Sequence, residues 1–300
     1  MATRTVTRPK RDTRQEAHEA LAAAFVAALE EGLADPQGWV PPWHQDGFLG
    51  GAVNASTSKR YHGGNAWRLG LIEAAGLHSG PWATFKQWQA LGAQVRKGEK
   101  GTMILAPRPV EVEDKKTGET RKIVLFRAFT VFGANQVDGW TPPEVADRAP
   151  EGERVAAFEE WLARWESVAD VRYARQAKAY FSPSADYVSL PEVDCFKSHA
   201  GRVATVTHEA GHWTGHESRL GRFGSGPTDK AEYGREELVA ELTSALMGQH
   251  FGLTGPGELT DDHRDYLANW LQAIREDASV VWEAATKASK AQAYLLAVGE

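Results

Sequence analysis

Cysteine and long apolar runs are the two features that this sequence of 300 residues most clearly lacks. Cys195 is its only cysteine, so the chain can form no internal disulfide, which is consistent with a reducing compartment. A lone cysteine is usually a small buried apolar residue, so we do not expect Cys195 to act as a nucleophile. No stretch approaches the roughly 20 uninterrupted apolar residues that span a bilayer, and residues 1–20 contain charges but no apolar signal segment. The composition therefore predicts a cytoplasmic protein without a membrane partner.

What the sequence does contain is enough apolar material for a core and an uneven distribution of charge. Apolar residues make up 42 % of the chain, and the length suggests about two domains. The net charge of −6 is the sum of a positive net charge in the first half of the chain and a negative net charge in the second half. Residues 1–140 carry 18 basic against 14 acidic side chains (+4), whereas residues 141–300 carry 16 against 26 (−10). This difference indicates that the two halves have different tasks.

Hydrophobic periodicity and turn residues divide the chain into two differently built parts. Helices are predicted over residues 13–32, 65–75, 84–91, 154–168, 196–215, 231–251 and 260–296. Two β-rich stretches within 102–132 flank the sequence KKTGE, which is typical of a β-hairpin. A short extended piece is expected at 186–190, and residues 140–152 are typical of a linker. We therefore predict an α+β protein with two domains, residues 1–140 and residues 153–300.

A candidate metal site lies in the segment VTHEAGHWTGH, which contains the pattern H-E-x-x-H at His208, Glu209 and His212. Residues four apart share one helical face, so both imidazoles can bind one ion. Zinc lowers the pKa of a bound water to about 7, and Glu209 is placed to accept its proton during peptide cleavage. Ser198 can cap this helix, and Gly211 fits close packing against a neighbour. Chance alone gives the pattern with odds on the order of a few per cent, so two structural histidines remain the alternative.

A catalytic site of this kind needs a third protein ligand and one open position. The metzincin-like pattern H-E-x-x-H-x-x-G-x-x-H fits poorly, because Ser218 stands where its last histidine would be. REELVAEL offers Glu237 and Glu241 one turn apart, which resembles the E-x-x-x-D arrangement of gluzincins. In gluzincins the first acid binds the metal, and the second supports a histidine ligand from the outer coordination shell. We predict that Glu237 binds the metal and that Glu241 supports a histidine ligand. We rank Glu236 below both, because on a helix its side chain points about 100° away from that of Glu237. The alternative is that these acids simply form a solvated helix face.

The sequence alone does not decide which strand would bind a peptide, which residue would stabilise an oxyanion, or which ion is bound. The extended piece at 186–190 is either an edge strand along which a peptide binds or an ordinary core strand. Four residues are chemically suited to stabilise an oxyanion, and none can be singled out: Tyr233, His250, His263 and Tyr266. Zn²⁺ is the expected ion, although a His/His/Glu set also accepts Mn²⁺ or Co²⁺.

The first half contains a basic stretch with interleaved aromatic residues. Residues 51–109 hold eight basic against two acidic side chains (+6) and five rings: Tyr61, Trp67, Trp82, Phe85 and Trp88. Cations that follow phosphates, beside rings that stack on bases, are typical of single-stranded nucleic-acid binding. Aromatic residues at helical spacing are more often core, and basic residues often form a solvated face, so both interpretations stand.

Several ordered motifs resemble the ArdC antirestriction family over nearly the whole chain. In the first half these are PPWHQDG, NASTSKRYHGGN, PWATFKQWQALGAQVRKGEKGT and FTVFGANQVDG. In the second half, HEAGHWTGHESRLGR and YGREELVAEL are similar to that family's metallopeptidase domain, also met in polyvalent proteins of phages and conjugative plasmids. One departure is at Gly64 or Ala66, where the family often has an aromatic or aliphatic residue.

The resemblance implies an N-terminal α+β domain that binds single-stranded DNA and a mainly helical, zincin-like metallopeptidase domain of gluzincin type. It also implies a role in protecting an incoming mobile element from restriction enzymes. The residues that it suggests for the DNA-binding segment are Trp43, Tyr61, Trp67, Trp82, Lys86, Trp88, Arg96 and Lys97.

Three hypotheses of function follow from these observations. The first is an antirestriction protein that combines single-stranded DNA binding with a metal-dependent peptidase acting on an unidentified protein or peptide. The second is a DNA-binding shield whose metal domain is structural or catalytically silent. The third is an acidic DNA mimic, which the balance of −10 in the second half permits but the basic first half argues against.

Overall fold

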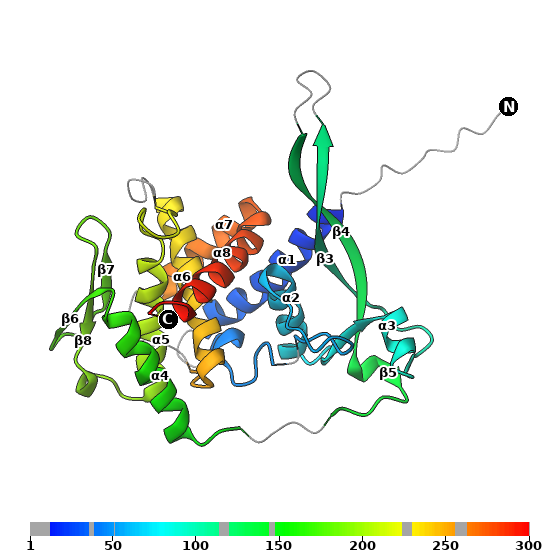
Figure 1. Cartoon of the computed structure of the whole chain (residues 1–300), viewed down its shortest axis with the longest axis horizontal. Helices are drawn as coiled ribbons and strands as arrows, with labels where there is room; N and C mark the ends of the chain where they lie inside the picture. Colours follow the sequence, from blue (N-terminus) through cyan, green and yellow to red (C-terminus); the bar gives the residue numbers. More distant parts are fainter. Residues whose placement is uncertain are drawn as a thin grey trace.

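In a computed structural model of the chain, the structure describes residues 13–35, 39–50, 52–113, 120–143, 148–223, 230–255 and 263–299. The fold is α+β with two domains, and the helices of both domains meet in the middle of the molecule (Figure 1). Within the described ranges, no helix combines the length and apolar character needed to cross a membrane.

The N-terminal half consists of helices and a small antiparallel sheet. Its elements are α1 (Thr13–Ala34), the 3₁₀ helix η1 (Pro42–His44), α2 (Gly63–Ala74), β1 (Trp82–Thr84), α3 (Phe85–Ala90), β2 (Gln94–Val95), β3 (Thr102–Glu113), β4 (Thr120–Gly133), the 3₁₀ helix η2 (Ala134–Gln136) and β5 (Val137–Asp138). The sheet order is β1-β4-β3, and β2 pairs separately with β5. Helix α3 begins after Thr84 with a capping box, in which Thr84 and Gln87 exchange side-chain to backbone hydrogen bonds.

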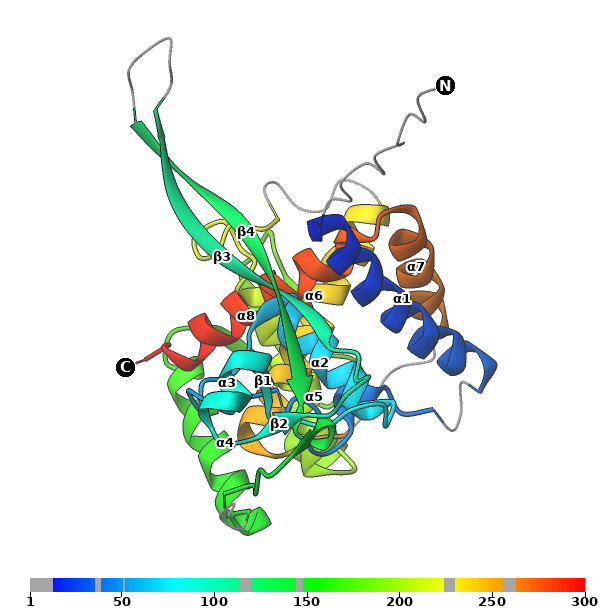
Figure 2. The ribbon, with the colours of Figure 1, turned by 90° about the vertical axis from the view of Figure 1, so that its right-hand side faces the viewer.

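Strands β3 and β4 form the predicted hairpin, a long twisted ribbon that projects from the body of the molecule (Figure 2). Its register runs from Thr102 opposite Val131 to Glu113 opposite Thr120. The predicted KKTGE turn lies outside the described residues. Alternating β-branched and aromatic residues favour this extended pairing.

The C-terminal half is mainly helical. Its elements are α4 (Glu151–Glu166), β6 (Asp170–Ala174), β7 (Tyr180–Ser182), β8 (Tyr187–Pro191), the 3₁₀ helix η3 (Val193–Cys195), α5 (His199–Trp213), α6 (Lys230–Phe251), α7 (His263–Glu276) and α8 (Ser279–Leu296). The Ser198 side chain accepts a hydrogen bond from the Gly201 N–H at 3.0 Å, which confirms the predicted cap of α5. The single helix predicted over 260–296 is wrong, because the chain breaks between α7 and α8, where Asp277 accepts a 2.9 Å hydrogen bond from the Ser279 N–H.

The extended piece predicted at 186–190 is strand β8, which lies in the centre of a three-stranded sheet. Strand β6 pairs with it in parallel on one side, and β7 pairs with it antiparallel on the other. Val188 and Leu190 are fully buried. The edge-strand interpretation of this segment is therefore wrong and the core-strand interpretation is confirmed. Strand β7, which contacts α5, is an edge of the sheet instead.

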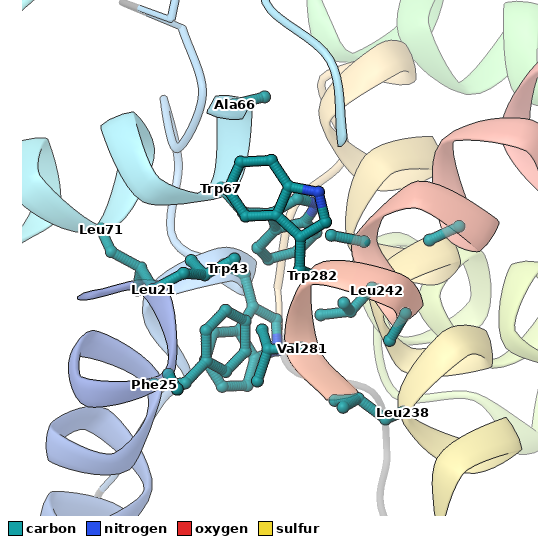
Figure 3. Packing of buried hydrophobic residues seen from close by; sticks show 14 of the residues in the cluster. Leu21, Phe25, Trp43, Ala66, Trp67, Leu71, Leu238, Leu242, Val281 and Trp282 are labelled. Carbon is teal, nitrogen blue, oxygen red and sulfur yellow. The ribbon is translucent and has the colours of Figure 1, made fainter. Parts of the chain in front are cut away.

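One hydrophobic core is shared by the two halves. It joins buried side chains of α1, η1 and α2 to those of α6, α7 and α8. Figure 3 shows Phe25, Trp43 and Trp67 of the N-terminal half gathered beside Val281 and Trp282 of α8. A second core lies among α4, α5, β8 and the end of α8. The two domains are therefore held together by buried surface and not only by a linker, while their predicted boundaries stay a prediction.

Candidate metal centre

Helices α5 and α6 pack closely and carry the candidate ligands. Gly211 of α5 faces α6 at such a short distance that a Cβ there would lie 3.2 Å from the Ala240 Cα. Glycine thus permits an approach that a larger residue would hinder. This confirms the close packing predicted for Gly211, and it brings the acids of α6 within reach of the histidines of α5.

His208, His212 and Glu237 converge on one point at this contact. One donor atom from each lies within 4.8 Å of the others. The Nε2 atoms of His208 and His212 each lie 3.4 Å from a different oxygen of Glu237. The three residues line a cavity of about 320 Å³. Two imidazoles and one carboxylate, with access from a cavity, form a donor set that suits a divalent cation with one position left open.

Each histidine also has a carboxylate near its other ring nitrogen. Glu241 Oε2 lies 3.7 Å from His208 Nδ1, and Glu236 Oε1 lies 3.6 Å from His212 Nδ1. Such outer partners fix the orientation and tautomer of a ligating ring. Glu241 therefore lies where the sequence predicts a supporting acid. Glu236 is not among the three converging donors, as its lower rank predicts, but it faces the second histidine, which the sequence does not predict.

Arg222 holds Glu236 in place. Its guanidinium donates to both oxygens of Glu236, at 3.0 and 2.6 Å, and also to the Gly211 carbonyl at 2.7 Å and the Thr214 hydroxyl at 2.8 Å. The side chain is almost completely buried, so these charge-assisted bonds are shielded from solvent. Arg222 is absent from the predicted site residues, because it lies beyond the end of α5, where helical spacing gives no signal.

Burial and the carboxylates together determine the charge of the cluster. Burial alone would lower the pKa of His208, but Glu237 and Glu241 outweigh it and raise that pKa well above its usual value. In the same way, Glu237 and Glu236 outweigh burial at His212 and raise its pKa to about 9. Burial works to raise the pKa of Glu237, yet the two histidines hold it far below its usual value. The cluster therefore attracts positive charge, which protons or a metal ion can supply.

Glu209 lines the same cavity but is not among the three converging donors. Its carboxylate is buried and accepts a hydrogen bond from the backbone N–H of Phe181 in the edge strand β7. Burial raises the pKa of Glu209 above its usual value. A carboxyl group with a raised pKa is suited to take up and return a proton near neutral pH.

The residues that line the cavity show which of the other predicted residues are close enough to contribute to the site. Four aromatic rings line part of it: Tyr180, Phe181, Phe196 and Phe223. Tyr233, which is 44 % exposed, also lines it. His250 is not among the lining residues, and the side chains of His263 and Tyr266 lie outside the described part of the chain. Cys195 is exposed and borders the cavity, so the expectation of a buried cysteine is wrong.

The residues predicted to bind DNA fall into a buried and an exposed group. Four have no exposed surface and belong to hydrophobic cores: Trp43, Trp67, Trp82 and Trp88. A fully buried ring offers no face to a base, so these four tryptophans are core residues in this structure and not stacking residues. Tyr61 is partly buried, and its hydroxyl accepts a hydrogen bond from Asn54 at 2.9 Å.

Two residues of the exposed group, Arg96 and Lys97, line a shallow recess beside α3, and Lys86 lies on α3 itself. Lys86, Arg96 and Lys97 are all exposed, and Arg96 is paired with Glu99 at 2.8 Å. Phe85, which sequence composition alone does not separate from the buried rings, is 40 % exposed and lines the recess with Arg96 and Lys97. The structure thus brings one accessible ring and two cations together, and Glu99 and Asp138 also line the recess.

Comparisons with known proteins cover both halves of the chain. The family of zincin-like metallopeptidases matches residues 156–287, and the N-terminal domain of anti-restriction factor ArdC matches residues 15–132. Protein y4eC of Sinorhizobium fredii, described as uncharacterised, is 36 % identical over 287 residues, which cover 93 % of this chain and 91 % of that protein. DNA primase TraC of Escherichia coli is 36 % identical over 300 residues and 93 % of this chain, but the chain spans only 27 % of that primase.

Solved structures show the same relationship. The metal-free crystal structure of antirestriction protein ArdC from plasmid R388 is 32 % identical, with a TM-score of 0.72, and the match covers 94 % of this chain and 97 % of that one. Its Mn(II)-bound crystal structure matches with a TM-score of 0.73 and the same coverage. The similarity therefore extends over both domains in the same order and confirms the resemblance of the sequence motifs. The chain belongs to the ArdC antirestriction family, with an ArdC-type N-terminal domain followed by a zincin-like metallopeptidase domain.

Proposed function

We propose that this protein acts in the cytoplasm to protect incoming plasmid or phage DNA from restriction, by binding single-stranded DNA and by using a metal-dependent peptidase-type site. The observation that carries the proposal is the convergence of His208, His212 and Glu237 beside Glu209 in one cavity. Family membership supports the antirestriction role, and the Mn(II)-bound relative supports a divalent ion. The same donors suit Zn²⁺, and they accept Mn²⁺ or Co²⁺ as well.

The side chains of the centre would divide the work of peptide hydrolysis. When bound to the three ligands, a divalent ion polarises a carbonyl and lowers the pKa of a coordinated water. Glu209 would accept the proton of the attacking water and pass it to the leaving amine, for which its raised pKa is suited. Glu241 and Glu236 would hold the outer ring nitrogens of the histidines. Tyr233 would donate to the developing oxyanion from the cavity wall.

A peptide substrate would bind along strand β7. This strand pairs with β8 on one side and borders the cavity through Tyr180 and Phe181. An extended peptide can add to such an edge through main-chain hydrogen bonds. Because Phe196 and Phe223 also line the cavity, the site would favour a substrate with an apolar side chain near the scissile bond.

Single-stranded DNA would bind at the recess beside α3. Phe85 is an exposed ring there, and neither Lys86 nor Lys97 forms an ion pair with another residue that the structure describes. We expect Phe85→Ala to weaken single-stranded DNA binding by about 5-fold to 150-fold, because stacking contributes roughly 1–3 kcal/mol per base. Leu77→Ala is the control, since Leu77 is exposed but does not line the recess. Fluorescence anisotropy with a labelled oligonucleotide measures both, and equal affinities would remove Phe85 from the interface.

The peptidase part is tested with Glu209→Gln, which keeps the shape of the side chain but cannot accept a proton. We expect one metal ion per chain in the wild-type protein and in this variant, by elemental analysis, and none in His208→Ala. Protection is measured as plasmid transfer into a restricting recipient relative to a non-restricting one. Loss of protection in both variants supports hydrolysis.

The alternative function, a DNA-binding shield with a catalytically silent metal domain, predicts a different pattern. Protection would then survive Glu209→Gln at the wild-type level. Loss in His208→Ala alone would show that the metal is needed for structure but not for chemistry. The core shared by the two halves is the observation that makes this alternative specific, since it connects the metal domain to the stability of the whole chain.

A further inference from the structure

A short segment of the N-terminal half lies directly against the metal centre. It contains η1, and it contacts α6 of the C-terminal half. Trp43 Nε1 donates a hydrogen bond to Glu241 Oε1 at 3.0 Å, and His44 Nε2 lies 2.7 Å from the same oxygen. Because a carboxylate oxygen only accepts, His44 must carry its hydrogen on Nε2. Two neighbouring residues, nearly 200 positions before Glu241, thus supply both donors to one oxygen.

The two oxygens of Glu241 face two different parts of the molecule. While Oε1 takes the donors from the N-terminal half, Oε2 faces His208 Nδ1 at 3.7 Å. The side chains of His44 and Glu241 are each only 4 % exposed, so water cannot replace a lost partner at little cost. The two donors on the first oxygen therefore constrain the direction of the second oxygen, which faces the His208 ring.

We propose that Trp43 and His44 are positioning residues of the metal centre, which orient His208 through Glu241, so that the N-terminal half completes the site. This inference rests on the proposed function, in which His208 binds the metal. It assigns to the PPWHQDG segment a role in metal binding, whereas sequence resemblance connects that segment with DNA.

The segment is held rigidly enough for this role. The Trp43 ring stacks on Phe25 of α1 at 5.0 Å between centroids, and its edge meets Trp67 of α2 (Figure 3). The Gln45 carbonyl accepts a 2.8 Å hydrogen bond from Gln249 of α6, and Asp46 pairs with Arg148. Anchors on both sides of His44 therefore fix the segment to both halves of the molecule.

The hydrogen bonds to Glu241 can be removed while the rest of the interface stays. Trp43→Phe keeps an aromatic ring in the core but loses the N–H, and His44→Leu loses the second donor. His44→Gln keeps an N–H in nearly the same place and serves as the conservative rescue. Gln249→Ala is the matched control, because it removes a hydrogen bond between the same segment and the same helix without touching Glu241.

The experiment measures Mn²⁺ affinity of the full-length, metal-stripped protein from the electron paramagnetic resonance signal of the free ion. Outer partners of a metal ligand typically contribute 10-fold to 100-fold in affinity. We expect a loss of about that size in the variant with both Trp43→Phe and His44→Leu, a smaller loss in each single variant, and near-wild-type affinity in His44→Gln and Gln249→Ala. The Co²⁺ absorption spectrum should change only in the variants that lose a donor, since it reports ligand geometry and not stability.

Each outcome decides between the two proposals. If the wild-type protein binds Mn²⁺ and His208→Ala does not, but the donor-less variants bind as the wild type does, the inference is overturned and the proposed function stands. If the wild-type protein itself binds no Mn²⁺, both are overturned. Should the double variant fail to fold, Trp43→Phe alone against Gln249→Ala, compared in affinity and in Co²⁺ spectrum, gives the same decision.

Discussion

Replacing Gly64 with alanine is the sharpest test of the way in which the two halves pack. A Cβ at this position of α2 would lie 2.3, 2.4 and 2.7 Å from three atoms of the Trp282 ring in α8. The ring cannot easily move away, because His18 of α1 lies against it with ring centroids 5.1 Å apart. Overpacking of this kind costs about 1–3 kcal/mol, which exceeds the roughly 0.5–1 kcal/mol that alanine gains over glycine inside a helix.

We therefore expect Gly64→Ala to lower the free energy of unfolding and to reduce Tm by up to about 4 °C. Gly234→Ala in α6 is the matched control, since no atom lies within 4 Å of the new Cβ, and it should stabilise the protein by about 0.5–1 kcal/mol. Urea denaturation followed by circular dichroism measures both variants. If Gly64→Ala is as stable as the wild type or more stable, α2 does not pack on α8 as described, and the description of the shared core is wrong.

Three further predictions concern the metal centre, α5 and the recess. Glu236→Gln should weaken Mn²⁺ binding about 10-fold by releasing His212; unchanged affinity would remove Glu236 from the centre. Ser198→Ala should lower the free energy of unfolding by about 1 kcal/mol in urea denaturation, because the cap on the Gly201 N–H is lost; an unchanged midpoint would contradict this. Lys97→Ala should make the slope of log affinity for single-stranded DNA against log salt less negative by about 0.7, and an unchanged slope would place this lysine outside the interface.

The candidate ligands of α5 could be predicted from sequence because the signals are local. His208 and His212 are four residues apart, which places them on one helical face whatever surrounds the helix. The cap by Ser198 depends on residues only three positions away. The convergence of the two histidines with Glu237 is not a local signal, because it depends on how closely α6 packs against α5. Gly211 is the residue that permits this close packing.

The low rank of Glu236 shows where helical spacing stops being informative. An angle of about 100° on a helical wheel describes the direction in which a side chain leaves its own helix. It does not say where the neighbouring helix and its histidines lie. His212 lies one turn beyond His208 on α5, so it meets α6 at a different place and comes within 3.6 Å of Glu236. Arg222 then fixes that acid from a segment whose position only the tertiary fold determines.

Composition could not separate rings that stack on bases from rings that fill a core. Trp67, Trp82 and Trp88 lie in the same basic stretch as Phe85, yet these three are fully buried and Phe85 is not. The same aromatic residue type serves both purposes, and burial depends on the tertiary fold. Trp88 packs in a cluster with Val137, and Trp67 belongs to the core shared with α8. The short strand β7 escaped prediction for a related reason, since three residues carry too little periodicity to distinguish an edge strand from a loop.

The shared core changes how a loss of function in the first half should be interpreted. Trp43 belongs to a motif that resemblance assigns to a DNA-binding domain, but its indole N–H donates to Glu241 in the other domain. Under the proposed function, and if these residues position Glu241 as we propose, a substitution at Trp43 or His44 would reduce protection of DNA even if neither residue touches DNA. A defect in DNA binding and a defect in the metal centre would give the same result in a protection assay. Metal content and oligonucleotide affinity must both be measured for any variant between residues 41 and 47 before its effect is attributed to either site.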